Sequence, residues 1–443
     1  MTHLAWVDAL PKSWAAKPLR ATADYGVSNV DKVPADDEVP VRLCNYTDVY
    51  NNEFITLALD FMQATATVTE IAKFGLAVDD VAITKDSESW DDIGVPALMR
   101  ETAEDLVCGY HLALIRPRKQ QMDGAFLLRC LQAKPVRVQL ELAANGVTRF
   151  GIPKSDIGAM TLPVPPIAQQ RAIADYLDRE TARLDALVAA KERVLGLLAE
   201  KRRALITRAV TRGLDPRAPL RDSGIPWLGE VPAHWETLPL KRLVVRIESG
   251  VSVNAANCPA AAGEFGVLKT SAVFGGSFIA GENKSVVEAE VGRVACPVRA
   301  DSVIMSRMNT PSLVGEIGYV DRDYQNLFLP DRLWQIGFDD RRVGTRFMAS
   351  VMTSSGLRGV FSEMATGTSA SMKNLGQEDI LGVKVPLPPM DEQKQVVALI
   401  TAYSKTEAVL IAATQRTIAL LRERRAALIA AAVTGQVDVG SAE

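Results

Sequence analysis

The chain contains one long segment twice. Leu162–Asp215 returns 223 positions later, without a gap, as Val385–Asp438. The tripeptide Ala-Leu-Ile, for example, stands at 204–206 in the first copy and at 427–429 in the second. A repeat of this length and register indicates an internal tandem duplication. The fold therefore has to accommodate two equivalent long segments.

Both copies have the pattern of one long helix with a defined start. Each begins with a proline cluster, Leu-Pro-Val-Pro-Pro at 162–166 and Val-Pro-Leu-Pro-Pro at 385–389. Proline keeps the chain that precedes the helix extended. In the second copy, Asp391 and Glu392 place negative charge at the positive end of the helix dipole. About 40 residues at 1.5 Å each predict a helix of roughly 60 Å.

We expect the two helices to pair as an antiparallel coiled coil, because apolar residues recur near the 3.5-residue period in both. Polar residues such as Glu180 and Glu407 interrupt the stripe, so neither helix is expected to be stable alone. The alternative is two amphipathic helices packed in separate cores. The predicted pairing residues are Ile173, Leu177, Leu184, Leu187, Val194, Leu198 and Leu205 in the first copy, and Val396, Ile400, Tyr403, Leu410, Leu421 and Leu428 in the second.

A second repeat precedes each globular block. Ala5–Trp14 matches Pro226–Trp235 at an offset of 221, with the shared pattern Trp-x4-Pro-x2-Trp. We expect these tryptophans to pack against the fold rather than to bind a ligand. The predicted organisation is a first globular domain over 1–160, a first long helix over 161–215, a second globular domain over 216–383 with its lead-in at 222–238, and a second long helix with a C-terminal tail over 384–443.

The two globular blocks share a pattern of strands more than identical residues. Both contain short alternating apolar runs that are broken by Gly, Asn, Asp and Pro. The run at 80–85 corresponds to 301–307, and the run at 109–115 corresponds to 330–336. The predicted fold class is α+β, with two mixed α/β domains that alternate with two long helices in a pseudo-twofold arrangement. Unlike domains on a repeated frame are expected when each domain recognises something different.

The composition predicts a protein of the cytoplasm. The five cysteines are scattered and form no Cys-x-x-Cys pair, which is typical of reduced, mostly buried thiols. No secretory signal is visible in residues 1–17, and no apolar run approaches the roughly 18 residues of a membrane span. A net charge of −3 argues against a protein that coats nucleic acid by bulk attraction, although it permits a local basic surface.

Several motifs, in this order, resemble the specificity subunits of type I restriction-modification systems. They include the helix starts LPVPPIAQQ (162–170) and VPLPPMDEQ (385–393) and the lead-in IPWLGEVPAHW (225–235). Within the domains, ITKDSESWDDI (83–93) and SRMNTPSLVG (306–315) are also similar to segments of that family. The resemblance covers essentially the whole chain, and the first lead-in is its one degenerate motif.

The resemblance implies a role and a set of partners. Each domain is expected to recognise one half of an asymmetric, bipartite target in double-stranded DNA, through the major groove. The helix pair is expected to set the gap between the half-sites. The implied partners are two copies of an adenine N6-methyltransferase subunit, which uses S-adenosylmethionine, and an ATP-dependent translocase and endonuclease subunit. The candidate methyltransferase-docking residues are Pro165, Pro166, Gln170, Pro388, Pro389 and Gln393, together with the exposed sides of the long helices.

Basic and amide side chains in loops are the candidates for DNA contact, because Arg and Lys suit guanine and Asn and Gln suit adenine. Ordinary solvated loops and turns are the alternative for each of them. The first-domain candidates are Thr84, Lys85, Ser87, Arg116, Arg118, Lys119, Thr148 and Arg149. The second-domain candidates are Ser306, Arg307, Asn309, Thr310, Arg332, Thr368, Ser369 and Lys373.

The motifs of catalysis are missing from the sequence. It contains no G-x-x-x-x-G-K-[ST] phosphate loop, no G-x-G-x-x-G cofactor loop and no N-P-P-aromatic or D-P-P-aromatic methyltransferase motif. His3, His111 and His234 are too few and too scattered for a metal cluster or a hydrolytic triad. We therefore predict a chain without cofactor, metal or catalytic residues of its own. The alternatives are a coiled-coil adaptor whose domains bind proteins, an enzyme with its own nuclease or methylase site, and a specificity subunit that serves methylation alone.

Overall fold

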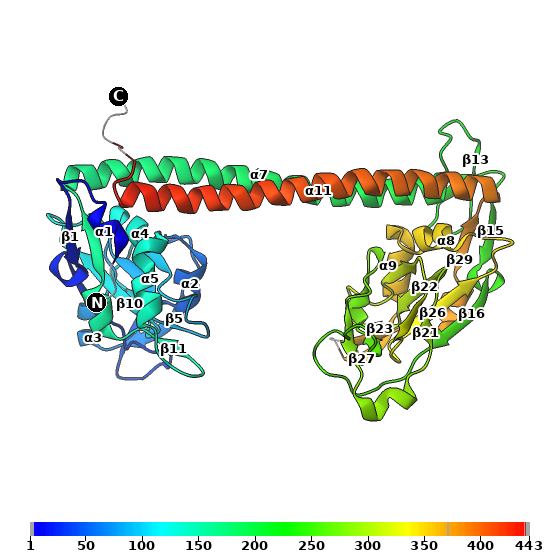
Figure 1. The fold of residues 1–443 in the computed structure, drawn as a ribbon, viewed down its shortest axis with the longest axis horizontal. Coiled ribbons are helices and arrows are strands. Elements are labelled where there is room, and N and C mark those ends of the chain that lie inside the picture. The colour runs from blue at the N-terminus through cyan, green and yellow to red at the C-terminus, as the bar shows by residue number, and fades with distance from the viewer. Residues whose placement is uncertain (1–3, 370–371, 438, 440–443) are drawn as a thin grey trace. The chain divides into compact units, whose positions relative to one another are not determined.

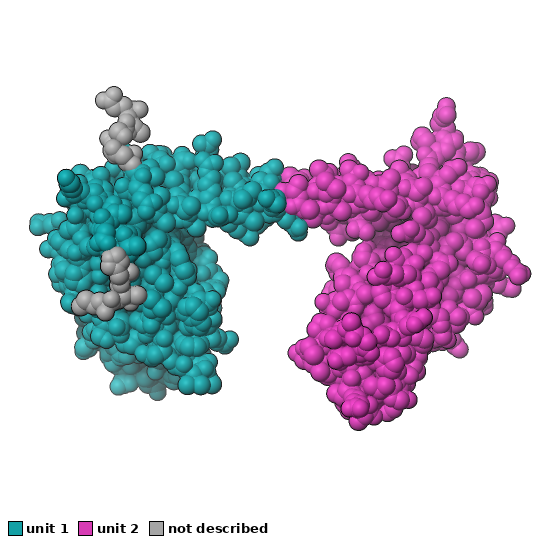
Figure 2. Space-filling model, in the orientation of Figure 1, with its two compact units in different colours: residues 1–192, 415–443 teal, residues 193–414 magenta. Residues whose placement is uncertain are grey.

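The structure is a computed structural model that describes residues 4–369, 372–437 and 439. These residues divide into two compact units, shown in separate colours in Figure 2. One unit comprises 1–192 and 415–443, and we call it the first half. The other comprises 193–414, and we call it the second half. Each half contains one globular domain and part of both long helices.

The two long helices lie where the repeat predicts them. Helix α7 spans Ile167–Arg212 and helix α11 spans Met390–Val433 (Figure 1). Within the first half, Arg422 pairs with Glu192 (2.8 Å) and Arg425 pairs with Asp185 (3.1 Å), so the helices run antiparallel there. Within the second half, Arg202 contacts Glu407 (3.7 Å).

The first domain consists of short strands and helices around one five-stranded sheet. Its helices are α1 (Ala5–Asp8), α2 (Tyr46–Asn51), α3 (Val68–Phe74), α4 (Gly124–Gln132), α5 (Lys134–Ala143) and α6 (Lys154–Ala159), with a 3-10 turn at Leu19–Ala21. Its strands are β1 (Ala15–Pro18), β2 (Ala23–Val27), β3 (Val39–Cys44), β4 (Phe54–Ile55), β5 (Met62–Ala66), β6 (Val81–Thr84), β7 (Asp86–Ser87), β8 (Pro96–Met99), β9 (Leu106–Cys108), β10 (Leu112–Pro117), β11 (Phe150–Gly151) and β12 (Thr161–Val164).

Two apolar cores sandwich the first domain's main sheet, whose strand order is β2-β10-β6-β8-β4. Residues of α4, α5 and α6 join Ile173 and Leu177 of α7 and Ile429 and Val433 of α11 in one core. The other core lies toward the sheet β5-β3-β9. Side chains of both long helices therefore form part of the first domain's own core, where they are excluded from water.

The second domain repeats this plan with more strands. Its helices are α8 (Thr345–Met352), α9 (Ser355–Met364) and α10 (Gln377–Gly382), with 3-10 turns at Leu240–Arg242, Thr270–Ala272 and Glu288–Arg293. Its strands are β13 (Leu220–Asp222), β14 (Glu230–Pro232), β15 (Glu236–Pro239), β16 (Val244–Ser249), β17 (Gly266–Leu268), β18 (Val273–Phe274), β19 (Gly276–Phe278), β20 (Asn283–Ser285), β21 (Pro297–Val298), β22 (Ser302–Ser306), β23 (Met308–Asn309), β24 (Ile317–Val320), β25 (Tyr324–Phe328), β26 (Leu333–Phe338), β27 (Thr366–Ser369), β28 (Met372–Asn374) and β29 (Lys384–Leu387).

The second domain's main sheet has the order β16-β26-β22-β24-β19-β18. Its larger core combines this sheet with α8, α9 and α10 and with Ile206 and Val210 of α7 and Val396 of α11. A smaller core lies toward the sheet β20-β17-β25-β21.

Each lead-in segment forms a strand beside the start of a long helix. Ala15 pairs with Val164 in the β1–β12 ladder, and Glu236 pairs with Leu387 in the β15–β29 ladder. These pairs keep the repeat offsets of 221 and 223 residues, so both ladders have the same register. The duplication therefore includes the strand that fixes how each long helix begins.

The last turn of each long helix packs against a lead-in tryptophan through a glycine. Gly213 (φ 70°) and Gly435 (φ 72°) both adopt the left-handed conformation that commonly ends a helix. A Cβ added at Gly213 would lie 3.1 Å from Trp235, and one added at Gly435 would lie 2.4 Å from Pro11 and 3.5 Å from Trp14. Glycine is required here by both the backbone and the close approach.

The buried stripe of the long helices differs from the predicted one in the middle of each helix. Ile173, Leu177, Leu184 and Val396 are buried as predicted, and Leu198, Leu205, Ile400, Tyr403, Leu421 and Leu428 are half-buried. Leu187 (45% exposed), Val194 (42%) and Leu410 (49%) are exposed, so their assignment to the stripe is wrong. The 3-4 spacing continues through Val188, Leu195 and Ile411, which are half-buried, one residue beyond the predicted positions.

Two composition-based expectations have different outcomes. Cys44, Cys108 and Cys130 are buried, and burial raises the pKa of each thiol, while Cys258 is exposed.

The expectation that no segment has the hydropathy of a membrane span is wrong for α11, which contains an 18-residue stretch with a mean hydropathy of 1.5. Length and composition are weak evidence for a span, and α11 carries buried Glu407 and the ion-paired Arg422 and Arg425.

Candidate nucleic-acid interface

The first candidate loop follows β6, and its hydroxyl groups face the interior. Thr84 is fully buried, and its Oγ1 accepts a hydrogen bond from the N–H of Val95 (3.0 Å). Ser87 is 8% exposed, and its Oγ accepts from the N–H of Ser89 (3.2 Å). The predicted DNA contacts of Thr84 and Ser87 are therefore wrong, because both hydroxyl groups hold the loop itself.

Lys85 is committed to an internal ion pair. Its Nζ lies 2.7 Å from Oδ2 of Asp86, and the same oxygen lies 2.8 Å from Nδ1 of His111. Burial raises the pKa of the Asp86 carboxyl, but hydrogen bonds from Lys85 and His111 outweigh burial, so this pKa lies below its ordinary value. The exposed Arg149 places Nη2 3.4 Å from both ring nitrogens of His111. Lys85 and His111 thus share one carboxylate at the end of β6, and Arg149 lies beside His111.

The basic run after β10 divides into a structural arginine and two surface residues. Arg116 donates to both carboxylate oxygens of the buried Asp80 (2.7–3.2 Å) and to the carbonyl of Gly75 (2.7 Å). Arg116 therefore holds β10 to the loop before β6, and because its side chain is still 42% exposed, its DNA contact stays a prediction. Arg118 pairs with Asp24 (2.6 Å) at the surface, and Lys119 is exposed.

The second candidate loop follows β22 and is held by its own polar groups. Ser306 is fully buried, and its Oγ accepts from Nδ2 of Asn309 (3.2 Å), so its predicted DNA contact is wrong. Oδ1 of Asn309 accepts from the N–H of Thr310 (2.9 Å), whose side chain is exposed. Asn309 is half-buried and lies opposite Lys373 in the β23–β28 ladder.

Helix α9 holds the far end of this loop. Nη1 of Arg358 donates to the carbonyl of Val314 (2.8 Å), and Nη2 of Arg358 pairs with Glu316 (3.1 Å). The carboxylate of Glu316 also accepts from the N–H of Gly275 (2.7 Å). The loop is consequently preorganised by residues that the sequence analysis did not identify.

Arg307 has a buried polar atom without a hydrogen-bond partner in the described structure. Its guanidinium Cζ lies 5.6 Å from the ring centroid of Trp334, and its buried Nε makes no hydrogen bond in the described structure. Arg332, at the end of the neighbouring strand, is exposed. Thr368 and Ser369 lie on β27, and their side chains lie outside the described part of the chain.

The two candidate loops have the same backbone scaffold. The N–H of Lys85 donates to the carbonyl of His111 (3.0 Å), as the N–H of Arg307 donates to the carbonyl of Arg332 (3.0 Å). One residue earlier, the carbonyl of Thr84 accepts from Gly94, and the carbonyl of Ser306 accepts from Gly315. Gly94 (φ 72°) and Gly315 (φ 74°) share the left-handed conformation. Lys85 and Arg307 therefore occupy one equivalent position, which we call the basic position.

The starts of the long helices are fixed by two equivalent, buried glutamines. Oε1 of Gln170 accepts from the N–H of Asp123 (2.9 Å), and its Nε2 donates to the carbonyls of Gln121 (2.9 Å) and Pro165 (2.8 Å). Oε1 of Gln393 accepts from the N–H of Gly344 (2.9 Å). Its Nε2 donates to two carbonyls, those of Arg342 (3.1 Å) and Pro388 (2.9 Å).

Burial of these glutamines corrects the predicted docking surface. Gln170, Gln393, Pro165 and Pro388 are buried, so the prediction that they contact a methyltransferase is wrong. A repeated polar residue is equally compatible with a repeated internal contact, which the sequence could not distinguish. Of the six docking candidates, Pro166 and Pro389 are the two that are exposed.

The lead-in tryptophans pack and donate hydrogen bonds at the same place. Nε1 of Trp14 donates to Gln169 (3.0 Å), and Nε1 of Trp235 donates to Glu392 (2.9 Å). His234 also lies 2.6 Å from Glu392. The prediction that these tryptophans serve packing is confirmed by the structure.

A buried charge network joins the first domain to both long helices within the first half. Arg129 of α4 is 1% exposed and pairs with Glu53 (2.7 Å) and with Asp178 of α7 (2.7 Å). Arg425 of α11 pairs with the same Glu53 and with Asp185. Burial lowers the pKa of Arg425, but Glu53 and Asp185 outweigh burial and raise this pKa. No motif marks these residues in the sequence, because their partners are distant along the chain.

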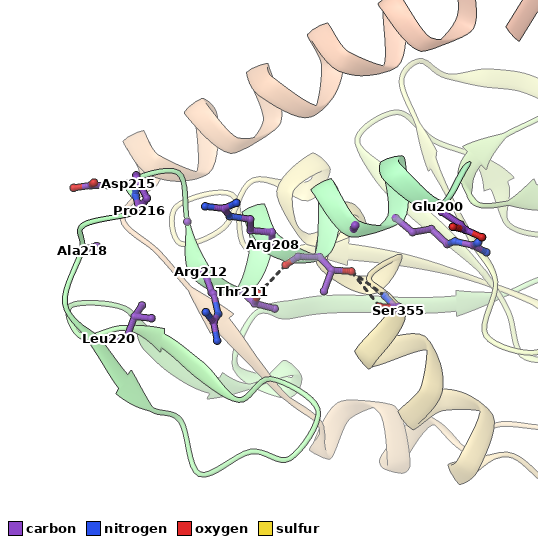
Figure 3. Close-up of a pocket in the computed structure, with 13 residues that line it drawn as sticks. Glu200, Arg208, Thr211, Arg212, Asp215, Pro216, Ala218, Leu220 and Ser355 are labelled. Carbon is purple, nitrogen blue, oxygen red and sulfur yellow. Dashed lines mark hydrogen bonds between the residues drawn. The ribbon is translucent and has the colours of Figure 1, made fainter. Parts of the chain in front are cut away.

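A groove of about 830 Å³ follows the C-terminal part of α7 in the second half (Figure 3). Its lining includes Arg203, Arg208 and Arg212, and Arg212 already pairs with Glu230 (3.0 Å). The hydroxyl of Thr207 lies 3.2 Å from that of Ser355. The lining residues include no histidine or cysteine, so they offer no nucleophile paired with a neutral base.

Comparison with known proteins places these features in a family context. No family model matches the chain. The type I restriction enzyme EcoKI specificity subunit of Escherichia coli is 23% identical over 405 residues, which cover 88% of this chain and 81% of the relative. The StySPI specificity subunit of Salmonella potsdam is 22% identical over 399 residues, with the same two coverages. The chain resembles type I specificity subunits.

Solved structures agree at the level of the fold. A chain from a structure described as showing complex assembly and conformational transition of the type I R-M system matches with a TM-score of 0.69. It is 15% identical, and the match covers 97% of this chain and 99% of the other. The HsdS subunit of Thermoanaerobacter tengcongensis matches with a TM-score of 0.50 and 16% identity, over 97% and 98% of the two chains. The resemblance to type I specificity subunits, first seen in the motifs, is confirmed, and an α+β fold is shared.

Proposed function

We propose that the chain is the non-catalytic DNA-specificity subunit of a type I restriction-modification complex. The observation that carries the proposal is similarity to specificity subunits over 88% of the chain, combined with two unlike domains on a duplicated frame. In this proposal each domain recognises one half of an asymmetric bipartite target in the major groove of double-stranded DNA. Its place of action is the cytoplasm, where the DNA target is present.

The accessible candidates define the proposed DNA surface. In the first domain these are Thr148 and Arg149, which are exposed next to β11 and the loop after β6, and Arg118 and Lys119, which are exposed at the opposite end of the sheet after β10. In the second domain they are Arg307, Asn309, Thr310, Arg332 and Lys373. Arginine and lysine neutralise phosphates or bind guanine, and asparagine suits adenine, so these residue types fit DNA recognition.

The long helices are proposed to set the spacer and to bind the methyltransferase subunits. A helix of 46 residues such as α7 is about 69 Å long at 1.5 Å per residue. Pairing of α7 and α11 as one antiparallel coiled coil with pseudo-twofold symmetry would give a spacer of fixed length. The helices also expose apolar side chains that a partner helix can cover. They are Leu187, Val194, Leu197, Leu399, Val409, Leu410 and Leu420.

The chemistry is proposed to reside in the partners. Two adenine N6-methyltransferase subunits would use S-adenosylmethionine, and a translocase and endonuclease subunit would use ATP. This chain would direct them to the target without a cofactor of its own.

A single-molecule methylome tests the proposal directly. Cells that express this chain with its methyltransferase subunit are compared with cells that lack the chain. We expect a new, split, asymmetric motif with a fixed gap and one methylated adenine in each half. Absence of a new motif, when the two proteins co-purify, would contradict the proposal and favour a protein-binding adaptor.

Exchange of one domain tests whether the two domains act independently. Replacement of residues 18–160 by the corresponding domain of another specificity subunit should change one half-site and leave the other half-site intact. The methylome again supplies the measurement. A change in both half-sites would contradict independent recognition.

A further inference from the structure

The basic position offers an internal comparison between the two domains. Lys85 and Arg307 follow equivalent strands and have equivalent backbone hydrogen bonds on both sides. The carbonyl of Lys85 accepts from the N–H of Ile152 (2.9 Å), and the carbonyl of Arg307 accepts from the N–H of Leu375 (2.9 Å). Any difference between the two side chains therefore reflects their surroundings rather than their place in the fold.

Those surroundings neutralise Lys85 and leave Arg307 unpaired. Lys85 is followed by Asp86, whose carboxylate lies 2.7 Å from the ammonium group. Arg307 is followed by Met308, and within the described residues no carboxylate lies within ion-pair distance of its guanidinium. The guanidinium instead lies over Trp334, which is 2% exposed and belongs to the domain core. A fixed aromatic surface restricts the plane of a guanidinium.

Three buried polar atoms around this position make no hydrogen bond in the described structure. They are Nε of Arg307, Nε1 of Trp334 and Oδ1 of Asn374. Asn374 lies opposite Met308 in the β23–β28 ladder, one residue before the backbone partner of Arg307. Buried polar atoms are nearly always satisfied in folded proteins. Their concentration beside an unpaired guanidinium shows that the described chain leaves the polar groups at this position unsatisfied.

We infer that Arg307 is the specificity-determining residue of the second domain and recognises a guanine. This inference rests on the proposed function and adds the base and the residue to it. The guanidinium donates to O6 and N7 of guanine in the major groove, the pair of acceptors that arginine matches with two parallel hydrogen bonds. Trp334 positions the guanidinium. Lys85, at the equivalent place, contributes no base contact because Asp86 already holds its ammonium group.

The test is the methylome of Arg307→Gln and Arg307→Lys variants, each expressed with the methyltransferase subunit. We expect one guanine of one half-site to become roughly tenfold to hundredfold less preferred, while the other half-site and the gap stay unchanged. Arg307→Lys keeps the charge but loses the planar fork, so it should relax the same base. Lys85→Gln and Arg341→Gln are matched controls, because each removes one positive charge, and neither should change a base preference.

The outcomes separate this inference from the proposed function. If the unaltered chain directs no motif, the proposed function fails. If it directs a split motif but both Arg307 variants keep every base preference, the inference alone is overturned. If the variants lower methylation of all sites equally without relaxing one base, Arg307 binds a phosphate, and the inference is also overturned. Altered base preference in Lys85→Gln would contradict the contrast between the two domains.

Discussion

The junction between the globular domain and the long helices differs between the two halves. In the first half, Arg129 lies at the junction between its domain and the long helices. It pairs with Glu53 and Asp178, and Glu53 also pairs with Arg425. In the second half, Ser350 stands at the 221-residue offset from Arg129, and the same place is an open groove of about 550 Å³. The first domain is thus joined to the helices by buried charges, and the described residues of the second half contain no equivalent network.

Other residues that line this groove also replace the charged or polar residues of the first half by smaller or uncharged ones. Thr401, Ser404 and Ala408 line it at the 223-residue offset from Asp178, Thr181 and Asp185. Arg202, the counterpart of Arg425, remains there and contacts Glu407 instead. By contrast, the glutamine and tryptophan contacts at the helix starts are the same in both halves. The duplicated frame therefore fixes where each helix begins, while the lateral contact between domain and helices is free to diverge.

The largest loss of unfolding free energy is expected when the buried arginine of the first half is removed. Arg129→Ala removes the buried partner of Glu53 and Asp178, which keep Arg425 and Arg100 as ion-pair partners, so the loss should be about 1.5–3 kcal/mol for each of the two charged hydrogen bonds. Ser350→Ala, the matched variant of the second half, should cost less than about 0.5 kcal/mol. Urea unfolding of the full chain measures both free energies. Similar losses for the two variants would show that the groove and the network are equivalent in energy.

The second prediction concerns the contact that the halves share. Gln170→Ala and Gln393→Ala each leave one N–H and two carbonyl groups without a partner, so each should lower the free energy of unfolding by about 2–3 kcal/mol. Gln415→Ala, at an exposed site on α11, is the control and should have little effect. Losses that differ severalfold between the two variants would contradict an equal role in the two halves.

The smallest expected effect is a loss of stability at low pH. Because the folded-state pKa of Asp86 is lowered, its contribution to stability is fully present above its unfolded pKa, near 3.9, and is lost as pH falls through the folded value. Asp86→Asn should remove this part of the pH dependence. Met308 occupies the equivalent place in the second domain, so this position carries no carboxylate there. Unfolding free energies at pH 6 and at pH 3, with and without the substitution, give the measurement. An unchanged pH slope would contradict the role of Asp86.

Much of the frame was predictable because the duplication repeats it. The 223-residue offset located both long helices, and the shared motif located both lead-in strands. The stripe failed by one residue at Leu187 and Val194, because neighbouring apolar residues at 187–188 and 194–195 fit the 3.5-residue period almost equally well. Tertiary contact alone selects Val188 and Leu195.

The candidate site was less predictable, for two physical reasons. Thr84, Ser87 and Ser306 belong to loops with the right residue types, but a hydroxyl group serves a turn as well as it serves a ligand. Arg129 and Arg358 were missed because a buried arginine has no sequence pattern of its own, and its partners come from other elements. Arg307 was included for its residue type, whereas its lack of a partner is visible only in the structure.

The glycine turns at the ends of the long helices have a topological consequence. Gly213 meets Trp235, which follows it closely in the sequence, whereas Gly435 meets Trp14, which lies far away in the sequence. The same junction is therefore formed once by neighbouring segments and once by distant segments. A short connection between the glycine and the tryptophan is not needed for this contact, so a backbone cut within 214–219 should leave the contact between Gly213 and Trp235 in place.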